Sequence, residues 1–280
     1  MERFERDGLV FDVTDRGPAD GPVVVLLHGF PENASSWDQV APALNQAGYR
    51  TLAPNQRGYS PGARPKGRRP YTLPLLAADV VALLDDAAAA RAHVVGHDWG
   101  GGVAWALAAW HAQRVTTVTS VSTPHPAAFL RSLGTSTQLF HSWYMLALQT
   151  PRLPERLILG RPGGPLDMVT QLVRSGLPAD VARRYRDFLS APGALTAAIN
   201  WYRAMPLVSP RKLSAPVSVP SLYVWSTEDQ FLGRKSAELT ERYVNAPYQF
   251  EVFEHTSHWI PETEPARLAS ILLEHFKAHT

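Results

Sequence analysis

One short segment of the chain carries a side chain suited to covalent catalysis. Residues 96–101, Gly-His-Asp-Trp-Gly-Gly, follow an apolar run and precede a helix-like segment. Glycines on both sides of a central residue are typical of a strained turn that lifts one side chain above a sheet, because larger neighbours would clash there. That side chain is Asp98, whose carboxylate is ionised at neutral pH and can attack an sp³ carbon without a base. The pattern predicts a nucleophile, although Asp98 taken alone could simply cap the next helix.

A second acid and a histidine follow late in the chain, each just beyond a strand-like run. Asp229 could orient a histidine, but without a partner it could equally be a turn residue. His258 is the candidate base, and His255, three positions earlier, is its main rival. Nucleophile, acid and histidine in this order predict a catalytic triad of Asp98, Asp229 and His258.

A third segment, residues 28–32 with the sequence His-Gly-Phe-Pro-Glu, follows the first apolar run. Such a loop can supply a backbone amide that binds the negative oxygen formed during hydrolysis of an ester. We predict that the amides of Phe30 and Trp99 form this oxyanion hole. The alternative is an ordinary strand-to-loop turn.

These segments must be positioned by the elements before them. The unbroken apolar run 23–27 ends at polar residues, which indicates a strand buried on both faces of a parallel sheet. Similar strand-like runs that end at polar residues lie at 92–96, 115–121 and 221–225, and 248–253 is also strand-like. Helix-like segments lie between them at 37–47, 75–90 and 101–111. This alternation predicts an α/β fold with a mostly parallel sheet flanked by helices and the site at the carboxyl ends of its strands.

The character of the chain changes in its middle part, where strand-like runs disappear. Helical patterns are expected at 130–149, 166–175, 178–190 and 194–205. After a proline-rich stretch the alternation of strands and helices resumes. We therefore predict a first part of the α/β core at residues 1–125, an inserted helical cap at 126–210 and a second part of the core at 211–280.

Composition excludes several classes of protein. The 280 residues are 45% hydrophobic and 19% charged, which is typical of a globular domain. There is no cysteine, so disulfides, a thiolate nucleophile and cysteine-ligated metals are excluded. The net charge of +2 comes without a basic stripe, so no nucleic-acid partner is expected. No apolar run is long enough for a membrane span and the first residues are polar, so a cytoplasmic protein is expected. The oligomeric state cannot be predicted.

Over essentially its whole length the chain resembles the epoxide hydrolases of the α/β-hydrolase fold, the branch with an aspartate nucleophile that is related to haloalkane dehalogenases. Two further segments support the resemblance, because family members carry a tyrosine in segments similar to residues 142–149 and 200–203. The resemblance implies that Tyr144 and Tyr202 hold and protonate an epoxide oxygen. Packing is the alternative for any aromatic residue in a cap, and Tyr71 and Tyr185 are assigned to it.

The resemblance implies hydrolysis of a small apolar epoxide to a vicinal diol through an ester of Asp98, with neither a metal nor an organic cofactor. We expect an apolar substrate pocket with four aromatic residues from the middle segment: Phe129, Phe140, Trp143 and Trp201.

Three other functions were weighed. Haloalkane dehalogenases usually place Asn or Trp, which can bind halide, where this chain has Phe30. Haloacid (fluoroacetate) dehalogenases have Arg where this chain has Trp99. A non-catalytic ligand-binding protein of the same fold is a further alternative, whereas a serine esterase is excluded by the absence of Ser or Cys at position 98.

Overall fold

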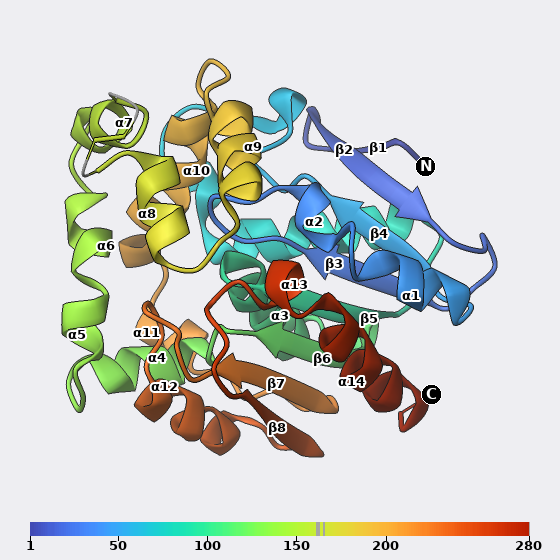
Figure 1. Ribbon diagram of the computed structural model, residues 1–280. Coiled ribbons are helices and arrows are strands. Elements are labelled where there is room, and N and C mark those ends of the chain that lie inside the picture. Colours follow the sequence, from blue (N-terminus) through green and yellow to red (C-terminus); the bar gives the residue numbers. More distant parts are fainter. Residues whose placement is uncertain (161–162, 165, 280) are drawn as a thin grey trace.

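The computed structural model describes the chain except residues 161, 162, 165 and 280 and the side chains of residues 140 and 141. Its centre is an eight-stranded sheet with the order β1-β2-β4-β3-β5-β6-β7-β8, parallel from β4 to β8. The two antiparallel strands β1 and β2 extend one edge (Figure 1). The strands are β1 (Arg3–Arg6), β2 (Leu9–Arg16), β3 (Val23–Leu27), β4 (Arg50–Pro54), β5 (Ala92–His97), β6 (Val115–Val121), β7 (Ser221–Ser226) and β8 (Tyr248–Phe253).

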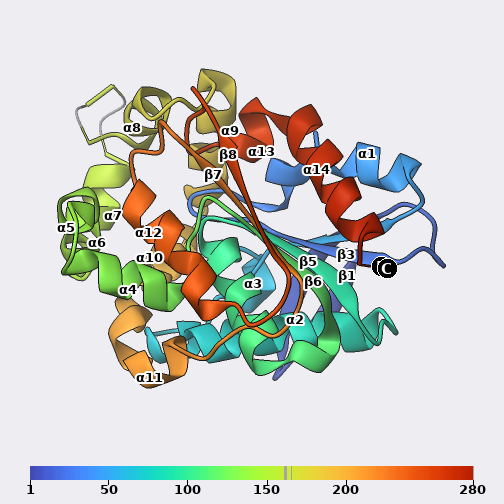
Figure 2. The same cartoon turned by 90° about the horizontal axis from the view of Figure 1, so that it is seen from below.

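Helices cover both faces of this sheet. Helices α1 (Ala41–Gln46) and α14 (Pro265–Lys277) lie on one face, and α2 (Leu73–Asp86) and α3 (Trp99–Trp110) lie on the other (Figure 2). Side chains of a strand point alternately to the two faces. Accordingly Val24 and Leu26 of β3 belong to the apolar cluster of α1 and α14, whereas Val25 and Leu27 belong to that of α2 and α3. The mostly parallel sheet with helices on both faces confirms the predicted fold class.

Three strands and part of the helical pattern differ from the sequence prediction. The prediction did not include β1, β2 and β4. The helix expected at 37–47 is instead a short 3-10 turn, η1 (Ala34–Trp37), followed by the brief helix α1. The backbone of the intervening residues does not continue a single helix, and Pro42 stands in the first turn of α1, a position that proline favours.

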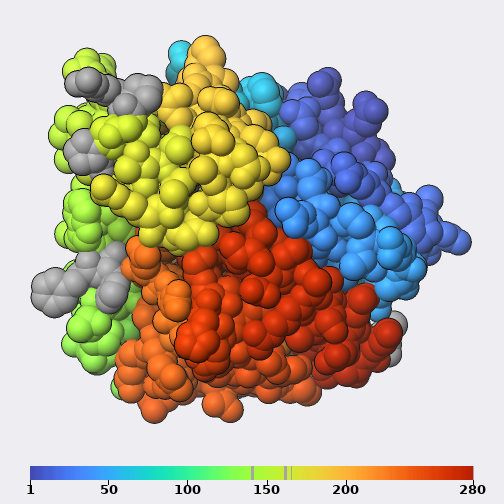
Figure 3. Space-filling model, viewed as in Figure 1, coloured from blue at the N-terminus to red at the C-terminus, as the bar shows by residue number. Residues whose placement is uncertain are grey.

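Between β6 and β7 the regular elements of the described chain are helices. They are α4 (Pro126–Leu133), α5 (Gln138–His141), α6 (Trp143–Ala147), α7 (Leu153–Ile158), α8 (Met168–Arg174), α9 (Ala179–Leu189), α10 (Ala194–Ala204) and α11 (Pro210–Leu213). The prediction of a single helix at 130–149 is wrong. Helix α4 ends at Leu133, and Ser142 leaves the helical conformation between α5 and α6. Figure 3 shows this green and yellow segment along one side of the molecule, next to the orange and red C-terminal part.

Hydrogen bonds fasten the helical segment to the sheet part. The Trp201 indole of α10 donates to the Arg57 carbonyl at 2.8 Å, and the Gln138 amide donates to the Phe231 carbonyl at 2.7 Å. After β7, helices α12 (Arg234–Leu239) and α13 (Ile260–Thr263) complete the chain together with α14. None of the helices in the described residues has the length and apolar character that crossing a bilayer requires.

The loop beneath Trp201 depends on a buried ion pair, which generates a prediction. The Asp79 carboxylate accepts from Arg57 at 2.8 and 2.6 Å and from Arg6 at 2.7 Å. Asp79→Asn leaves the buried guanidinium of Arg57 without a countercharge. The free energy of unfolding in urea should therefore fall by about 3–5 kcal/mol.

The matched control is Asp85→Asn. Asp85 also pairs with an arginine, Arg114, at 2.6 Å, but its side chain is 63% exposed. Its loss should cost less than about 1 kcal/mol. Equal losses in the two variants would contradict the structural importance of the Asp79 pair.

Candidate active site

The turn that carries Asp98 lies between β5 and α3 and has an unusual backbone. Asp98 adopts φ 48° and ψ −120°, a conformation that L-residues rarely adopt. A Cβ atom on Gly96 would collide with the carbonyl of Gly100, and one on Gly100 would collide with that of Leu27. The two glycines therefore let α3 start directly against the sheet. The Thr123 hydroxyl, which donates to the Asp98 carbonyl at 2.7 Å, helps to fix the turn.

The loop after β3 runs beside the Asp98 side chain. The Phe30 amide donates to Asp98 Oδ1 at 2.8 Å, and a Cβ on Gly29 would strike Asp98. Trp99 is the first residue of α3, where backbone amides have no partner within the helix. Of the two amides predicted to form the oxyanion hole, that of Phe30 contacts the Asp98 carboxylate. That of Trp99 belongs to the residue that follows Asp98 in the chain.

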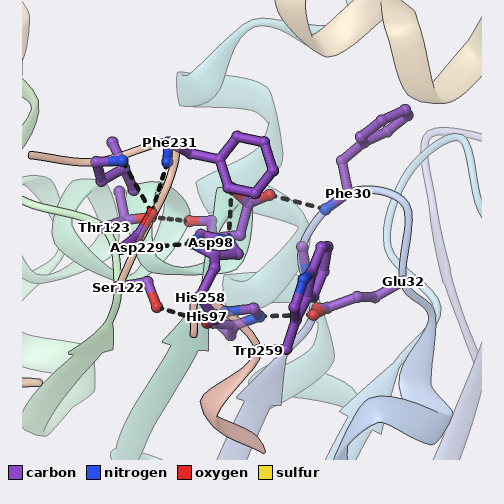
Figure 4. Close-up of polar contacts among 12 residues, drawn as sticks. Phe30, Glu32, His97, Asp98, Ser122, Thr123, Asp229, Phe231, His258 and Trp259 are labelled. Atoms are coloured by element: carbon purple, nitrogen blue, oxygen red, sulfur yellow. Dashed lines mark hydrogen bonds and ion pairs between the residues drawn. The ribbon is translucent and has the colours of Figure 1, made fainter. Parts of the chain in front are cut away.

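The predicted acid, Asp229, and the predicted histidine, His258, lie beside Asp98 (Figure 4). His258 Nδ1 lies 2.7 Å from Asp229 Oδ2, and His258 Nε2 lies 3.7 Å from Asp98 Oδ2. Asp229 is fixed in turn, because its Oδ1 accepts from the amides of Phe231 and Leu232 at 2.8 and 2.9 Å. The side chain of the rival His255 is 91% exposed and lies 3.8 Å from Glu228. The structure therefore brings Asp98, Asp229 and His258 together and leaves His255 outside.

The charges of this group alter the pKa values of its members. Burial opposes a charge on His258, but the charges of Asp229 and Asp98 and their hydrogen bonds raise its pKa to about 10. Burial likewise opposes ionisation of Asp98, but His258 and the Phe30 amide hold the pKa of Asp98 below its ordinary value. At neutral pH the site therefore contains an ionised nucleophile beside an imidazolium.

A buried pair that the sequence analysis did not assign, Glu32 and His97, contacts the backbone of His258. His97 Nδ1 lies 2.6 Å from Glu32 Oε1, and its Nε2 lies 3.0 Å from the His258 carbonyl oxygen. The second Glu32 oxygen accepts from the Gly29 amide at 2.6 Å, and Ser122 also donates to the His258 carbonyl. Glu32 and His97 thus connect the loop after β3, the Asp98 turn and the backbone of His258. Both residues stand inside the two motifs, which is the signal that could have revealed them.

Two tyrosines from the helical segment line the same cavity as Asp98. Tyr144 comes from α6 and Tyr202 from α10, and their ring centroids are 6.0 Å apart. Burial and the nearby charge of Asp98 raise the pKa of both phenols above the ordinary value. Both are therefore neutral proton donors at neutral pH. Tyr202 packs edge-on against Trp99 and Phe30, at centroid distances of 5.0 and 5.4 Å.

The cavity has a volume of about 400 Å³, and its described lining is mainly apolar. Phe129 and Trp201 line it as predicted, and so does Tyr71, which the sequence analysis assigned to packing. The prediction for Trp143 is wrong: its side chain is 62% exposed and does not line the cavity. The reason is helical geometry, since Tyr144 and Met145 occupy the inner side of α6.

Two remaining expectations concern a pocket residue and metal binding. The side chain of Phe140, also predicted to line the pocket, lies outside what the structure describes. Within the described residues there is no group of three or more His, Asp or Glu side chains that could hold a metal ion.

The influence of Asp98 on His258 can be measured. Asp98→Asn removes one of the two negative charges beside the imidazole, so the pKa of His258 should fall by about 1–2 pH units from its value near 10. An NMR titration of histidine ring protons, with the His258 signal assigned through His258→Gln, gives this value.

Asp85→Asn removes a carboxylate that pairs with Arg114 instead, and it should leave the His258 titration unchanged. If His258 titrates alike in Asp98→Asn and in the parent, the electrostatic coupling inferred from the 3.7 Å separation is absent.

Comparison with known proteins agrees with this geometry. Residues 22–265 match the model of a family described as alpha/beta hydrolase fold. The AB hydrolase superfamily protein YfhM of Bacillus subtilis is 36% identical, over 97% of this chain and 96% of that protein. Epoxide hydrolase A of Mycobacterium tuberculosis is 32% identical, over 96% and 95%. The crystal structure of Epoxide Hydrolase A from Mycobacterium thermoresistibile superposes with a TM-score of 0.81 at 26% identity, over 99% and 98%. The chain belongs to the α/β-hydrolase fold family and, within it, to the epoxide hydrolases.

Proposed function

We propose that this protein hydrolyses an epoxide to a vicinal diol through a covalent ester of Asp98. The observation that carries the proposal is the arrangement of the cavity, into which an ionised carboxylate and two neutral phenols project. A carboxylate can attack a ring carbon while the phenols bind the ring oxygen. Because Tyr144 and Tyr202 both belong to residues 126–210, we assign to this segment the role of a cap that completes the site.

In the first step, Asp98 attacks one ring carbon and the bond from this carbon to the ring oxygen breaks. Asp98 Oδ1 is held by the Phe30 amide, so we assign the attack to Oδ2, the oxygen nearer to His258. The ring oxygen becomes an alkoxide and takes a proton from Tyr144 or Tyr202. The products of this step are an alkyl ester and a hydroxyl group.

In the second step, a water molecule activated by His258 attacks the carbonyl carbon of the ester. The carbonyl oxygen, Oδ1, develops the negative charge and already faces the Phe30 amide, to which we add the Trp99 amide as second donor. Asp229 holds His258 in the orientation that presents Nε2 to the water. Collapse of the intermediate releases the diol and restores the Asp98 carboxylate.

The pKa of His258 connects the two steps. An imidazolium cannot accept a proton, and His258 is charged while Asp98 is ionised. Formation of the ester removes the Asp98 charge, so the pKa of His258 falls and the ring can act as a base. Ester formation consumes one proton and ester hydrolysis releases one. A proton lost from His258 restores the tyrosine that protonated the alkoxide in the first step, and the proton that His258 takes from water in the second step balances the cycle.

The first test is to trap the ester. His258→Gln removes the base of the second step but leaves Tyr144 and Tyr202 to protonate the ring oxygen in the first. Mixing this variant with styrene oxide should therefore add the mass of the epoxide to the peptide that contains Asp98, with negligible diol release. Proteolysis and mass spectrometry detect the adduct. His255→Gln is the control, because His255 is exposed and outside the site.

The control variant should release diol at nearly the parent rate without an adduct. If His258→Gln releases diol as fast as the parent, or if neither protein acts on any of a panel of aryl and alkyl epoxides, the proposed function is wrong. Tight binding of epoxides without turnover would instead favour a ligand-binding protein.

The second test distinguishes epoxide opening from dehalogenation, which uses the same nucleophile. An alkoxide is a far stronger base than a halide ion and needs a proton donor. Tyr144→Phe or Tyr202→Phe should therefore slow ester formation by about 10²-fold, and the double variant by more. Pre-steady-state alkylation rates measure this effect.

Tyr185→Phe provides the control, because the Tyr185 hydroxyl donates to Glu262 and does not line the cavity. Its alkylation rate should stay close to the parent rate. If the double variant forms the ester as fast as the parent, the two tyrosines only pack, and halide release from haloalkanes becomes the activity to measure.

A further inference from the structure

The cavity extends from Asp98 toward one side of the molecule. Its described lining includes Tyr71, Leu73, Thr123 and Leu232. Most of the lining comes from α4, from α6 and from the segment between α10 and the end of α11, with Phe129, Met145, Val208 and Leu213 as representatives. Helices α4 and α11 lie close together in Figures 1 and 2, away from α8 and α9. This apolar arm can accept a substituent on one carbon of the epoxide ring.

The opposite side of the catalytic residues is filled by packed side chains. Leu172 and Leu177, on and just after α8, are buried, and the buried Trp259 donates its indole N–H to Ser175 at 3.0 Å. The Phe231 ring stands between this region and the site, with its centroid 5.0 Å from that of His258. Among the described residues, none of α8 or α9 lines the cavity. A substituent on the second ring carbon would meet this packed wall.

The arm also disfavours charged substituents. Asp98 is the one charged side chain in the described lining, and the remaining polar side chains are neutral ones of tyrosine, threonine and tryptophan. A charged substituent would lose its hydration in the arm without finding a countercharge. A volume of about 400 Å³ is at the lower end of the range for small-molecule sites, so the arm suits a compact neutral group.

We propose that the substrates are terminal epoxides, which carry a neutral apolar substituent on one ring carbon and none on the other. This inference rests on the proposed function and narrows it to a substrate class. The unsubstituted carbon lies toward the packed wall of Phe231 and Trp259, and the substituent occupies the arm toward Val208 and Leu213.

The isomers 1,2-epoxyoctane and trans-4,5-epoxyoctane test this class, because they have the same atoms and differ in the position of the ring. The value of kcat/KM should be at least about tenfold higher for the terminal isomer. Equal or faster hydrolysis of the internal isomer overturns the substrate class but leaves the proposed function intact. If neither isomer alkylates Asp98 in the His258→Gln variant, and styrene oxide also fails to do so, the proposed function itself is overturned.

A pair of variants tests the arm directly. Val208→Phe narrows the arm and should lower kcat/KM for 1,2-epoxyoctane by about tenfold, with a much smaller effect on 1,2-epoxypropane, whose methyl group does not reach so far. Leu207→Phe is the matched control, because Leu207 is the neighbouring residue, is exposed and does not line the cavity. Leu213→Phe repeats the test if Val208→Phe does not fold. Equal losses for both substrates in these arm variants would overturn the assignment.

Discussion

The strained backbone of Asp98 is the constraint on which the rest of the structure depends. A residue held at φ 48° costs roughly 1–3 kcal/mol, and it persists only where its surroundings fix it. Here the surroundings are the close start of α3 at Gly100 and the hydroxyl of Thr123 on the Asp98 carbonyl. The same turn places the carboxylate under the Phe30 amide and opposite His258. One costly conformation therefore sets the position of the nucleophile and the atoms on both sides of it.

A second consequence of this arrangement is that the charge of Asp98, as well as its distance from His258, determines the order of the two chemical steps. The imidazole of His258 is buried between two carboxylates, and its affinity for a proton depends on whether Asp98 is charged or esterified. His258 is therefore protonated before the ester forms and free to accept a proton once the ester has formed. Glu32 and His97 do not touch the cavity, but they hold the backbone of His258 and the loop after β3. Their role is to keep these elements in place while the charge of the site changes.

The parts that could be predicted from the sequence are those with a local physical signature. Strand β3 is apolar on both faces. The glycines of the Asp98 turn are required by close contacts, so both features can be recognised in the sequence. By contrast, β2 is an edge strand with mixed exposure, and β4 contains Arg50 and Thr51, so neither has a continuous apolar run. The inner side of α6 depends on the break at Ser142, which explains the error at Trp143. The pairing of Glu32 with His97 and the contact of His97 with the His258 carbonyl join residues 65 and 161 positions apart, which a local sequence pattern does not reveal.

The order of the catalytic residues along the chain has a consequence for biosynthesis. Asp98, the turn that lifts it and the Phe30 loop all belong to the first strands made, whereas Asp229 and His258 follow β7 and β8, after the whole helical segment. At about 5–20 residues per second, the roughly 160 residues from nucleophile to base take about 10–30 s to synthesise. A nascent chain therefore contains the attacking group before the group that regenerates it. Only when β8 has paired with β7 is His258 in place beside Asp98. From that point the ester on Asp98 can be hydrolysed and the nucleophile can react again.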